Sequence, residues 1–415
     1  MRPATINDLM ASFGCTRWPE RWAELYDSVM DVFDAQGCIY TDPAFYDRLG
    51  EQYNVLKTYR DDYKQAAAEI GKDENLSRLL HLLCTVVQDR PHALTELPAF
   101  SMPVAPSGGR SVKYDMLPAL MMCAAYDHTY ELLTSQKLPQ KHIDYGMNRF
   151  DPMISTFKAR YNNAPGAKDW TWYHRTAVDA LLYKTGRLEV EVGMTFTDRA
   201  IVFEDTQCAG RTVAMATGGL YHRSGHMLGS KNYEDEAGAF EAKIEEDTDS
   251  WTGYIFDKNG LLSSQKTALE KSRWAKCIEP GDPVVALHIP PGGGMTPEKV
   301  DAAFAEAVAF LAEYFPEFHY KGFRCMSWIL DPKLIELLGE NSNLAQFIKR
   351  FDLMCLKSAG RDALNYVFLH PDPASAVIED LPEETSLQRK LKALYLSGDC
   401  IYETYGYIPK NRITG

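Results

Sequence analysis

The sequence predicts an α+β protein, with a helical domain first and a mixed α/β domain after it. In the first part of the chain apolar residues recur at helical spacing, whereas short alternating or β-branched apolar runs dominate the second part. A turn-rich stretch at residues 162–166 separates the two patterns, so we place the domains at residues 1–163 and 164–415. The length of 415 residues also favours two domains over a single core.

The composition is that of a globular protein and argues against two classes of partner. Hydrophobic residues make up 45% of the chain and charged residues 24%. A formal net charge of −13 argues against binding to duplex nucleic acid, because that affinity comes from Lys and Arg that neutralise phosphates. No apolar run approaches the roughly 18 residues that a membrane span needs. We therefore expect a small-molecule ligand, and neither nucleic acid nor a membrane as partner.

Cysteine usage and the N-terminal residues bear on the cellular compartment. The nine cysteines are scattered, their number is odd, and none forms a C-x-x-C pair, which favours free thiols over disulfides or a structural zinc site. Residues 1–10 lack the basic-then-apolar pattern of a signal peptide. The sequence predicts a cytoplasmic protein without a metal, and it gives no indication of the oligomeric state.

Amphipathic helices are predicted throughout the first domain. An apolar stripe over residues 22–33 ends at Gly37, and Asp42 then provides an N-cap in front of Pro43. Further helical stripes are expected at residues 75–87, 114–130 and 143–157. No catalytic or metal-ligating spacing stands out here, so the sequence predicts a helical packing domain.

The second domain opens with a mixture of elements. We predict a helix over residues 172–183 that ends at Gly186, because glycine is favoured just after a helix. A half-buried strand is expected at residues 188–192, where three apolar residues alternate with Glu189 and Glu191. Further strands are predicted at residues 200–203 and 213–216, and an acidic, exposed segment at residues 233–249.

A glycine loop between a strand and a helix is the strongest functional signal. The β-branched apolar run at residues 284–289 predicts a buried strand, and Pro290 and Pro291 follow it. Then come, in order, Gly292, Gly293, Gly294, Met295 and the predicted N-cap Thr296, before a well-patterned helix over residues 300–315. Free amides of a first helical turn, approached over glycines, bind phosphate. A flexible connection without a ligand is the alternative interpretation.

The elements after this helix complete a recognisable order. A strand is predicted at residues 323–330, helices begin after Asp331 and Ser342, and strands are expected at residues 352–356 and 364–369. The order strand, glycine loop, helix, strand, helix, strand, strand is that of the acyl-CoA-binding half of the GNAT fold.

The sequence also resembles a bacterial family of acyltransferase-domain proteins, which have a helical N-terminal domain and a GNAT-like C-terminal domain. The stretches that carry the resemblance are residues 183–189 (YKTGRLE), 280–296 (PGDPVVALHIPPGGGMT), 323–332 (FRCMSWILDP) and 342–351 (SNLAQFIKRF). The resemblance implies acyl-CoA or acetyl-CoA as co-substrate, with its pyrophosphate at residues 292–296. Pro290 and Pro291 stand where typical GNAT enzymes have Arg or Gln.

Acyl transfer to an amine needs a base for the amine and a donor for the carbonyl or the leaving thiolate. His288 ends the strand before the glycine loop and is the candidate base, although it can equally fix the loop by bonding a carbonyl. Cys325 and Ser327 share a face of the next predicted strand. Either is a candidate catalytic residue with His288, although cysteine in a strand is more often a core residue.

Other candidates have equally plausible structural interpretations. Arg187 is a candidate substrate-binding residue through its affinity for carboxylate or phosphate, or else an exposed arginine. Trp328 is a second substrate-binding candidate, or a packing residue. The tyrosines 402, 405 and 407 supply a candidate general acid, or else pack on the core.

We therefore expect an acyl-CoA-dependent N-acyltransferase acting on a small amine or an amino-acid-like substrate. A ligand-binding protein that has the fold without the chemistry is the main alternative. A hydrolase that pairs His288 with Cys325 or Ser327 is a third hypothesis.

Overall fold

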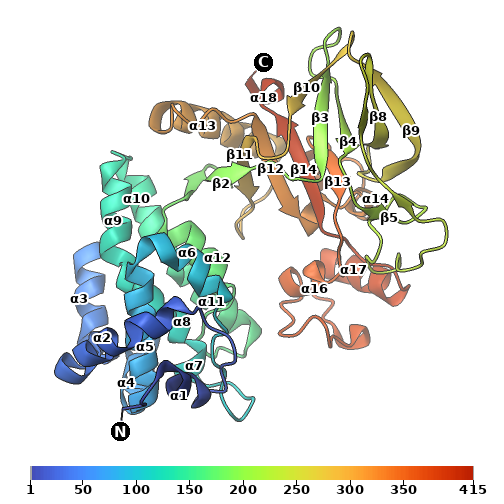
Figure 1. Ribbon diagram of the computed structural model, residues 1–415. Helices are drawn as coiled ribbons and strands as arrows, with labels where there is room; N and C mark the ends of the chain where they lie inside the picture. Colours follow the sequence, from blue (N-terminus) through green and yellow to red (C-terminus); the bar gives the residue numbers. More distant parts are fainter. Residues whose placement is uncertain (1, 415) are drawn as a thin grey trace. The chain divides into compact units, whose positions relative to one another are not determined.

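The computed structural model describes residues 2–414 and divides into two units, Met1–Tyr183 and Lys184–Gly415. The first unit is helical and the second is rich in sheet (Figure 1), which confirms the predicted α+β class. The domain boundary placed between residues 163 and 164 stays a prediction. Across residues 2–414, no helix combines the length and the apolar character that a bilayer crossing requires.

The first unit is built around helix α5 (Glu74–Gln88), whose leucines are buried on all sides. Helices α2, α4, α6 and α8 pack against it. The α-helices of this unit are α1 (Ile6–Ala11), α2 (Arg21–Gln36), α3 (Pro43–Tyr53), α4 (Arg60–Gly71), α5, α6 (Arg90–Ala99), α7 (Val112–Asp115), α8 (Leu117–Met122), α9 (Tyr126–Ser135), α10 (Gln140–Met147), α11 (Phe150–Arg160) and α12 (Trp170–Tyr173).

Local capping explains where the predicted helices begin and end. Helix α2 ends at Gly37, whose φ of +72° favours glycine, and the Asp42 side chain accepts the Ala44 N–H at 2.9 Å to open α3. The expected stripe at residues 75–87 is α5, which Asp73 caps by accepting the Leu76 N–H at 3.1 Å. These three predictions are confirmed.

Several predicted helices are shorter in the structure. The stripe at residues 114–130 is divided among α7, α8, a 3-10 turn and α9, and the stripe at residues 143–157 is interrupted between α10 and α11. The helix predicted at residues 172–183 is wrong in its second half. After α12 and a π-helical turn (His174–Val178), the chain enters strand β1 (Leu182–Thr185). Gly186, at φ +52°, turns β1 into β2 and does not cap a helix.

A six-stranded sheet forms the centre of the second unit. Its strand order is β1, β2 (Leu188–Thr195), β11 (Pro283–His288), β12 (Gly322–Ser327), β14 (Thr404–Pro409) and β13 (Asp352–Cys355). Strands β11 and β12 are parallel and are connected by helix α13 (Pro297–Tyr314), while β12 and β13 are antiparallel to β14. Phe304 of α13 packs edge-on against Phe323 of β12, with ring centroids 5.5 Å apart, so α13 covers the Phe323 face of the sheet.

The two parallel strands pair only over their first halves. In the described chain their register joins Val285 to Phe323 and Ala286 to Arg324 and goes no further. Yet β11 stays paired with β2 as far as His288, and β12 stays paired with β14 as far as Ser327. Strands β11 and β12 therefore separate toward their C-terminal ends. The glycine loop starts at this end of β11.

A second sheet follows β2 in the chain. Its strands are β10 (Trp274–Ile278), β3 (Ala200–Asp205), β4 (Thr212–Ala216), β8 (Ser250–Phe256) and β7 (Glu245–Glu246), with β9 (Leu262–Glu270) paired to β8. Strands β5 (Leu220–Tyr221) and β6 (Phe240–Glu241) form a separate pair. Strands β3 and β4 were predicted, whereas β8, β9 and β10 were not.

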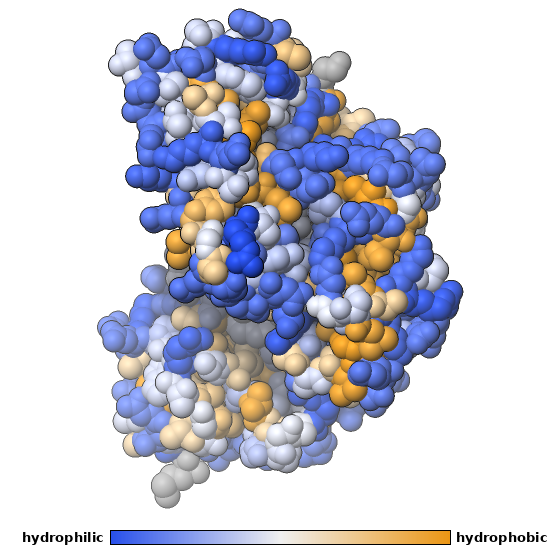
Figure 2. Space-filling view, turned by 90° about the vertical axis from the view of Figure 1, so that its right-hand side faces the viewer, coloured by the Kyte–Doolittle hydropathy of each residue, from blue (hydrophilic) through white to orange (hydrophobic). Residues whose placement is uncertain are grey.

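Hydrophilic side chains cover most of the face drawn in Figure 2, with hydrophobic patches among them.

The last part of the chain contains one wrong prediction and one missed strand. The helices are α14 (Lys333–Leu338), α15 (Asn343–Ile348), α16 (Asp362–Tyr366), α17 (Ser386–Leu396) and α18 (Asn411–Thr414). The strand expected at residues 364–369 is wrong, because α16 occupies residues 362–366; so short an apolar run does not distinguish a strand from a buried helix turn. The sequence also failed to indicate β14, which lies between β12 and β13.

Candidate active site

A buried carboxylate holds the histidine at the end of β11. The His288 Nε2 atom lies 2.7 Å from Oε2 of Glu191 on the neighbouring strand β2. The register places Glu191 opposite Ala286, so Glu191, Ala286 and His288 share one face of the sheet. Glu191 is only 1% exposed, while the His288 side chain is 28% exposed. A carboxylate on one ring nitrogen fixes the orientation and the tautomer of the imidazole.

Glu191 was missed because its strand has an ordinary amphipathic pattern. The alternation of apolar residues with Glu189 and Glu191 predicted a half-buried strand with both carboxylates in water. Instead residues 188–192 are all buried, and Glu189 is 2% exposed. The only signal in the sequence was a pair of carboxylates on a predicted strand. Glu191 becomes a partner of His288 only through the pairing of β2 with β11, which local sequence patterns do not predict.

Cys325 and Ser327 lie on the opposite face from His288. The pairing of Val285 with Phe323 puts Phe323, Cys325 and Ser327 on the face that α13 covers. Cys325 is buried, and burial raises the pKa of its thiol to about 12, so the thiol is protonated. The Ser327 Oγ accepts the Ile329 N–H at 3.2 Å and caps a 3-10 turn. Neither residue forms a nucleophile–base pair with His288.

Two of the three C-terminal tyrosines, Tyr405 and Tyr407, lie on the His288 face, and Tyr405 has an arginine over its ring. Tyr405 of β14 pairs with Met326, and the Arg324 guanidinium carbon lies 5.9 Å from the centroid of the Tyr405 ring. Burial raises the pKa of Tyr405 to about 12, so its hydroxyl keeps its proton at neutral pH. Tyr405 and Tyr407 are both buried, and the Tyr402 hydroxyl donates to the Lys231 carbonyl at 2.9 Å.

The glycine loop connects the end of β11 to the N-terminus of α13. Gly292 and Gly293 have φ values of +82° and +65°, which L side chains rarely adopt. A side chain added at Gly292 would meet no protein atom within 4 Å, so the backbone is open to an incoming group. Thr296 is the extended N-cap residue, and its side chain makes no capping bond to the helix amides. Met295, just before it, is half-buried.

Arg187 reaches the same loop from the turn between β1 and β2. Its Nη1 donates to the Pro290 carbonyl at 2.9 Å, and its Cδ lies 3.7 Å from where a Cβ of Gly293 would be. Burial lowers the pKa of Arg187, but a guanidinium titrates so high that it keeps its charge. The loop, which has prolines where Arg or Gln was expected, thus gains a cation from another element. Trp328 is buried in the 3-10 turn after β12.

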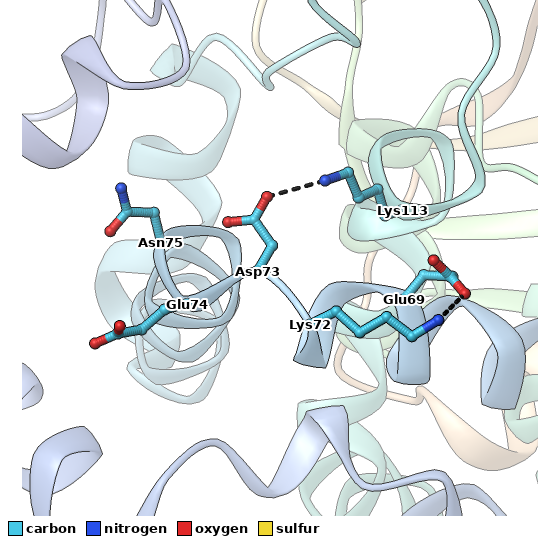
Figure 3. Close-up of a pocket in the computed structure, with 6 residues that line it drawn as sticks. All are labelled: Glu69, Lys72, Asp73, Glu74, Asn75 and Lys113. Atoms are coloured by element: carbon cyan, nitrogen blue, oxygen red, sulfur yellow. Dashed lines mark hydrogen bonds and ion pairs between the residues drawn. The ribbon is translucent and has the colours of Figure 1, made fainter. Parts of the chain in front are cut away.

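A separate pocket of about 480 Å³ lies in the first unit at the start of α5 (Figure 3). Its charges already have structural roles. Asp73 caps α5 and accepts from Lys113 Nζ at 2.9 Å, and Lys72 pairs with Glu69 at 2.5 Å. None of the residues expected to form the site lines this pocket. We therefore interpret this pocket as a structural feature of the helical unit and not as the candidate active site.

Comparisons with known proteins agree with this fold. A family model described as the GNAT-like C-terminal domain matches residues 182–408. A comparison with curated protein sequences finds no significant match.

Solved acyltransferase structures are similar over 99% of this chain and 99% of their own. One is in complex with decanoyl-CoA and teicoplanin (TM-score 0.62), one with CoA and 10C-teicoplanin (0.61), and one is a mutant with octanoyl-CoA (0.60). Each is 16% identical to this chain, so these likenesses show the fold. The family model spans more than half of the sequence, and the chain therefore belongs to the family of proteins with a GNAT-like C-terminal domain.

Proposed function

We propose that this protein is an N-acyltransferase that moves an acyl group from a coenzyme A thioester to a small or amino-acid-like amine. The observation that carries the proposal is the His288–Glu191 pair, with its 2.7 Å contact, at the end of β11 where β11 and β12 separate. The similar solved acyltransferases, which are bound to CoA, octanoyl-CoA or decanoyl-CoA, support the choice of donor.

The glycine loop and the start of α13 provide the site for the donor's pyrophosphate. The first-turn amides of α13 carry partial positive charge, and Gly292 to Gly294 let phosphate oxygens approach the backbone. The Arg187 guanidinium adds a full charge beside Gly293. The thioester arm then enters the gap between β11 and β12, where strand edges without a partner strand offer N–H and C=O groups.

In this proposal, residues on the His288 face of the sheet carry the chemistry. His288 takes a proton from the acceptor amine, whose nitrogen attacks the thioester carbonyl carbon. A C–N bond forms, the C–S bond breaks, and the thiolate leaves with the bonding electron pair. The protonated Tyr405 hydroxyl supplies the proton that the thiolate takes up, while Glu191 stabilises the imidazolium that His288 has become.

Thiol release tests the proposal directly. The full-length protein is incubated with acetyl-, octanoyl- and decanoyl-CoA and a panel of primary amines, and free CoA thiol is followed together with the mass of the amide product. We expect thiol release that depends on both donor and amine. Acyl-CoA binding without any release would favour the ligand-binding alternative, and absence of binding across the donor series would refute the proposal.

The position of Glu298 beside the glycine loop predicts that its charge weakens CoA binding. This exposed carboxylate lies in the first turn of α13, where its own backbone N–H and the Thr296 hydroxyl lower its pKa. It therefore competes with phosphate for the helix N-terminus. We expect Glu298→Gln to tighten CoA binding about two- to five-fold in calorimetry, since a charge at a helix terminus contributes about 0.3–1 kcal/mol.

Glu313→Gln, in the last turn of the same helix, is the matched control for that measurement. It makes the same change in net charge far from the loop and is expected to leave CoA affinity unaltered. An equal effect of both variants would assign the change to net charge alone.

A further inference from the structure

A positively charged pocket lies on the His288 face of the sheet. It has a volume of about 270 Å³, and its charged lining residues are Arg199, Arg324, Lys357 and Glu403, with Tyr405 beside them. The three cations come from different parts of the fold, namely the turn before β3, strand β12 and the segment after β13. Four charged groups thus meet at one small concavity of the second unit.

The cations in this pocket lack acidic partners. In the part of the chain that the structure describes, no ion pair involves Arg199, Arg324 or Lys357. The Arg324 Nε is also buried without a hydrogen-bond acceptor. Three cations and one carboxylate give the lining a charge of +2, although the whole chain carries −13. Burial and the charge of Asp362 raise the pKa of Glu403, which further weakens the only negative group.

The pocket is close enough to His288 for one small molecule to reach both. Arg324 is paired with Ala286, and His288 is two residues further along β11 on the same face. Strand spacing and rise in a regular sheet would put the Cα atoms of Arg324 and His288 about 8 Å apart, and the separation of β11 and β12 beyond Ala286 lengthens this distance. The ring of Tyr405 lies beneath the Arg324 guanidinium and limits its orientations.

We propose that this pocket binds a carboxylate of the acyl acceptor, so that the acceptor is a small amine that also carries a carboxylate. This inference rests on the proposed N-acyltransferase function. Arg324 is the principal partner, because a guanidinium binds a carboxylate through two parallel hydrogen bonds, and Arg199 and Lys357 add charge at the rim. The amine then lies toward His288 and Glu191, where its proton is removed.

Matched pairs of amino acids and their carboxamides test the inference, with steady-state kinetics at saturating acyl-CoA. We expect the carboxylate form to have a KM at least about tenfold lower, since a charged hydrogen-bonded contact is lost in the amide. Arg324→Gln should raise the KM of the acid, leave that of the amide nearly unchanged, and so remove the preference. Arg324→Lys keeps the positive charge but cannot form two parallel hydrogen bonds, and it is expected to retain part of the preference for the acid.

Two controls keep the outcomes distinct. Arg223→Gln removes an exposed arginine that pairs with Asp235 in another part of the unit and should keep the wild-type preference. Thermal unfolding of each variant shows whether it is folded. Equal KM values for acid and amide in the wild type would overturn the carboxylate pocket but not the proposed acyltransferase function. A preference for the acid that persists in Arg324→Gln would have the same consequence. Absence of thiol release with every amine overturns both proposals.

Discussion

Replacing His288 with alanine is expected to lower kcat for acyl transfer by about 10²- to 10⁴-fold, which is the usual contribution of a general base. The amine acceptor is protonated at neutral pH, and in this protein the imidazole at the end of β11 is held by a buried carboxylate at 2.7 Å. The affinity for acyl-CoA should change little, because the glycine loop and Arg187 remain intact. Single-turnover thiol release and calorimetry separate these two effects.

Two companion variants decide whether the histidine acts as we propose. Glu191→Gln is expected to lower kcat by at least about tenfold, because an amide cannot stabilise the imidazolium and can impose the wrong tautomer. Cys325→Ala removes the thiol from the opposite face, so kcat should stay close to that of the wild type. A collapse of activity in Cys325→Ala, with a folded protein, would favour the cysteine hydrolase hypothesis.

The second large effect is expected at the glycine loop. Gly292→Val places a β-branched side chain at φ +82°, which costs about 1–3 kcal/mol unless the backbone moves. Either response harms donor binding, because the loop shifts or the new side chain lies where a phosphate approaches. We expect the Kd for CoA to rise about 10- to 100-fold, measured by calorimetry.

Gly281→Val is the matched control for the loop variant. Gly281 has a φ of +87°, and a side chain added there would also meet no atom within 4 Å. It lies just before β11, at the end of that strand away from the glycine loop. The two variants should lose similar stability, while only Gly292→Val loses CoA affinity. Similar losses of affinity in both would mean that strain, and not the loop, determines binding.

Local patterns predicted the elements that depend on local physics. The run at residues 284–289, the glycines after it and the stripe of α13 were all visible, because capping and side-chain periodicity are properties of neighbouring residues. The same reasoning located α2, α3 and α5.

Elements defined by distant partners were not predictable in this way. Strand β14 contains Tyr405, Gly406 and Tyr407 and is stabilised by hydrogen bonds to β12 and β13, whose paired residues lie 49 or more positions earlier in the chain. The first two residues of β1, Leu182 and Tyr183, were assigned to the end of a helix because the pairing of β1 with β2 leaves no local pattern.

The site shows the same division between local and distant information. His288 was a candidate because it precedes the glycine loop, and the loop itself was a candidate for the same local reason. Its partner Glu191 and the cation pocket depend on strand register, which brings together residues from β2, β11, β12 and β14. Register also separates His288 from Cys325 and Ser327, which a shift of one residue would have placed on the same face.

Amide hydrogen exchange with and without CoA reports where the donor binds. If the glycine loop holds the pyrophosphate, CoA slows exchange in peptides that cover residues 290–299, where the loop and the first turn of α13 lie, and in the C-terminal ends of β11 and β12. CoA binding that leaves residues 290–299 unprotected, with protection confined to other segments, would contradict this placement of the pyrophosphate.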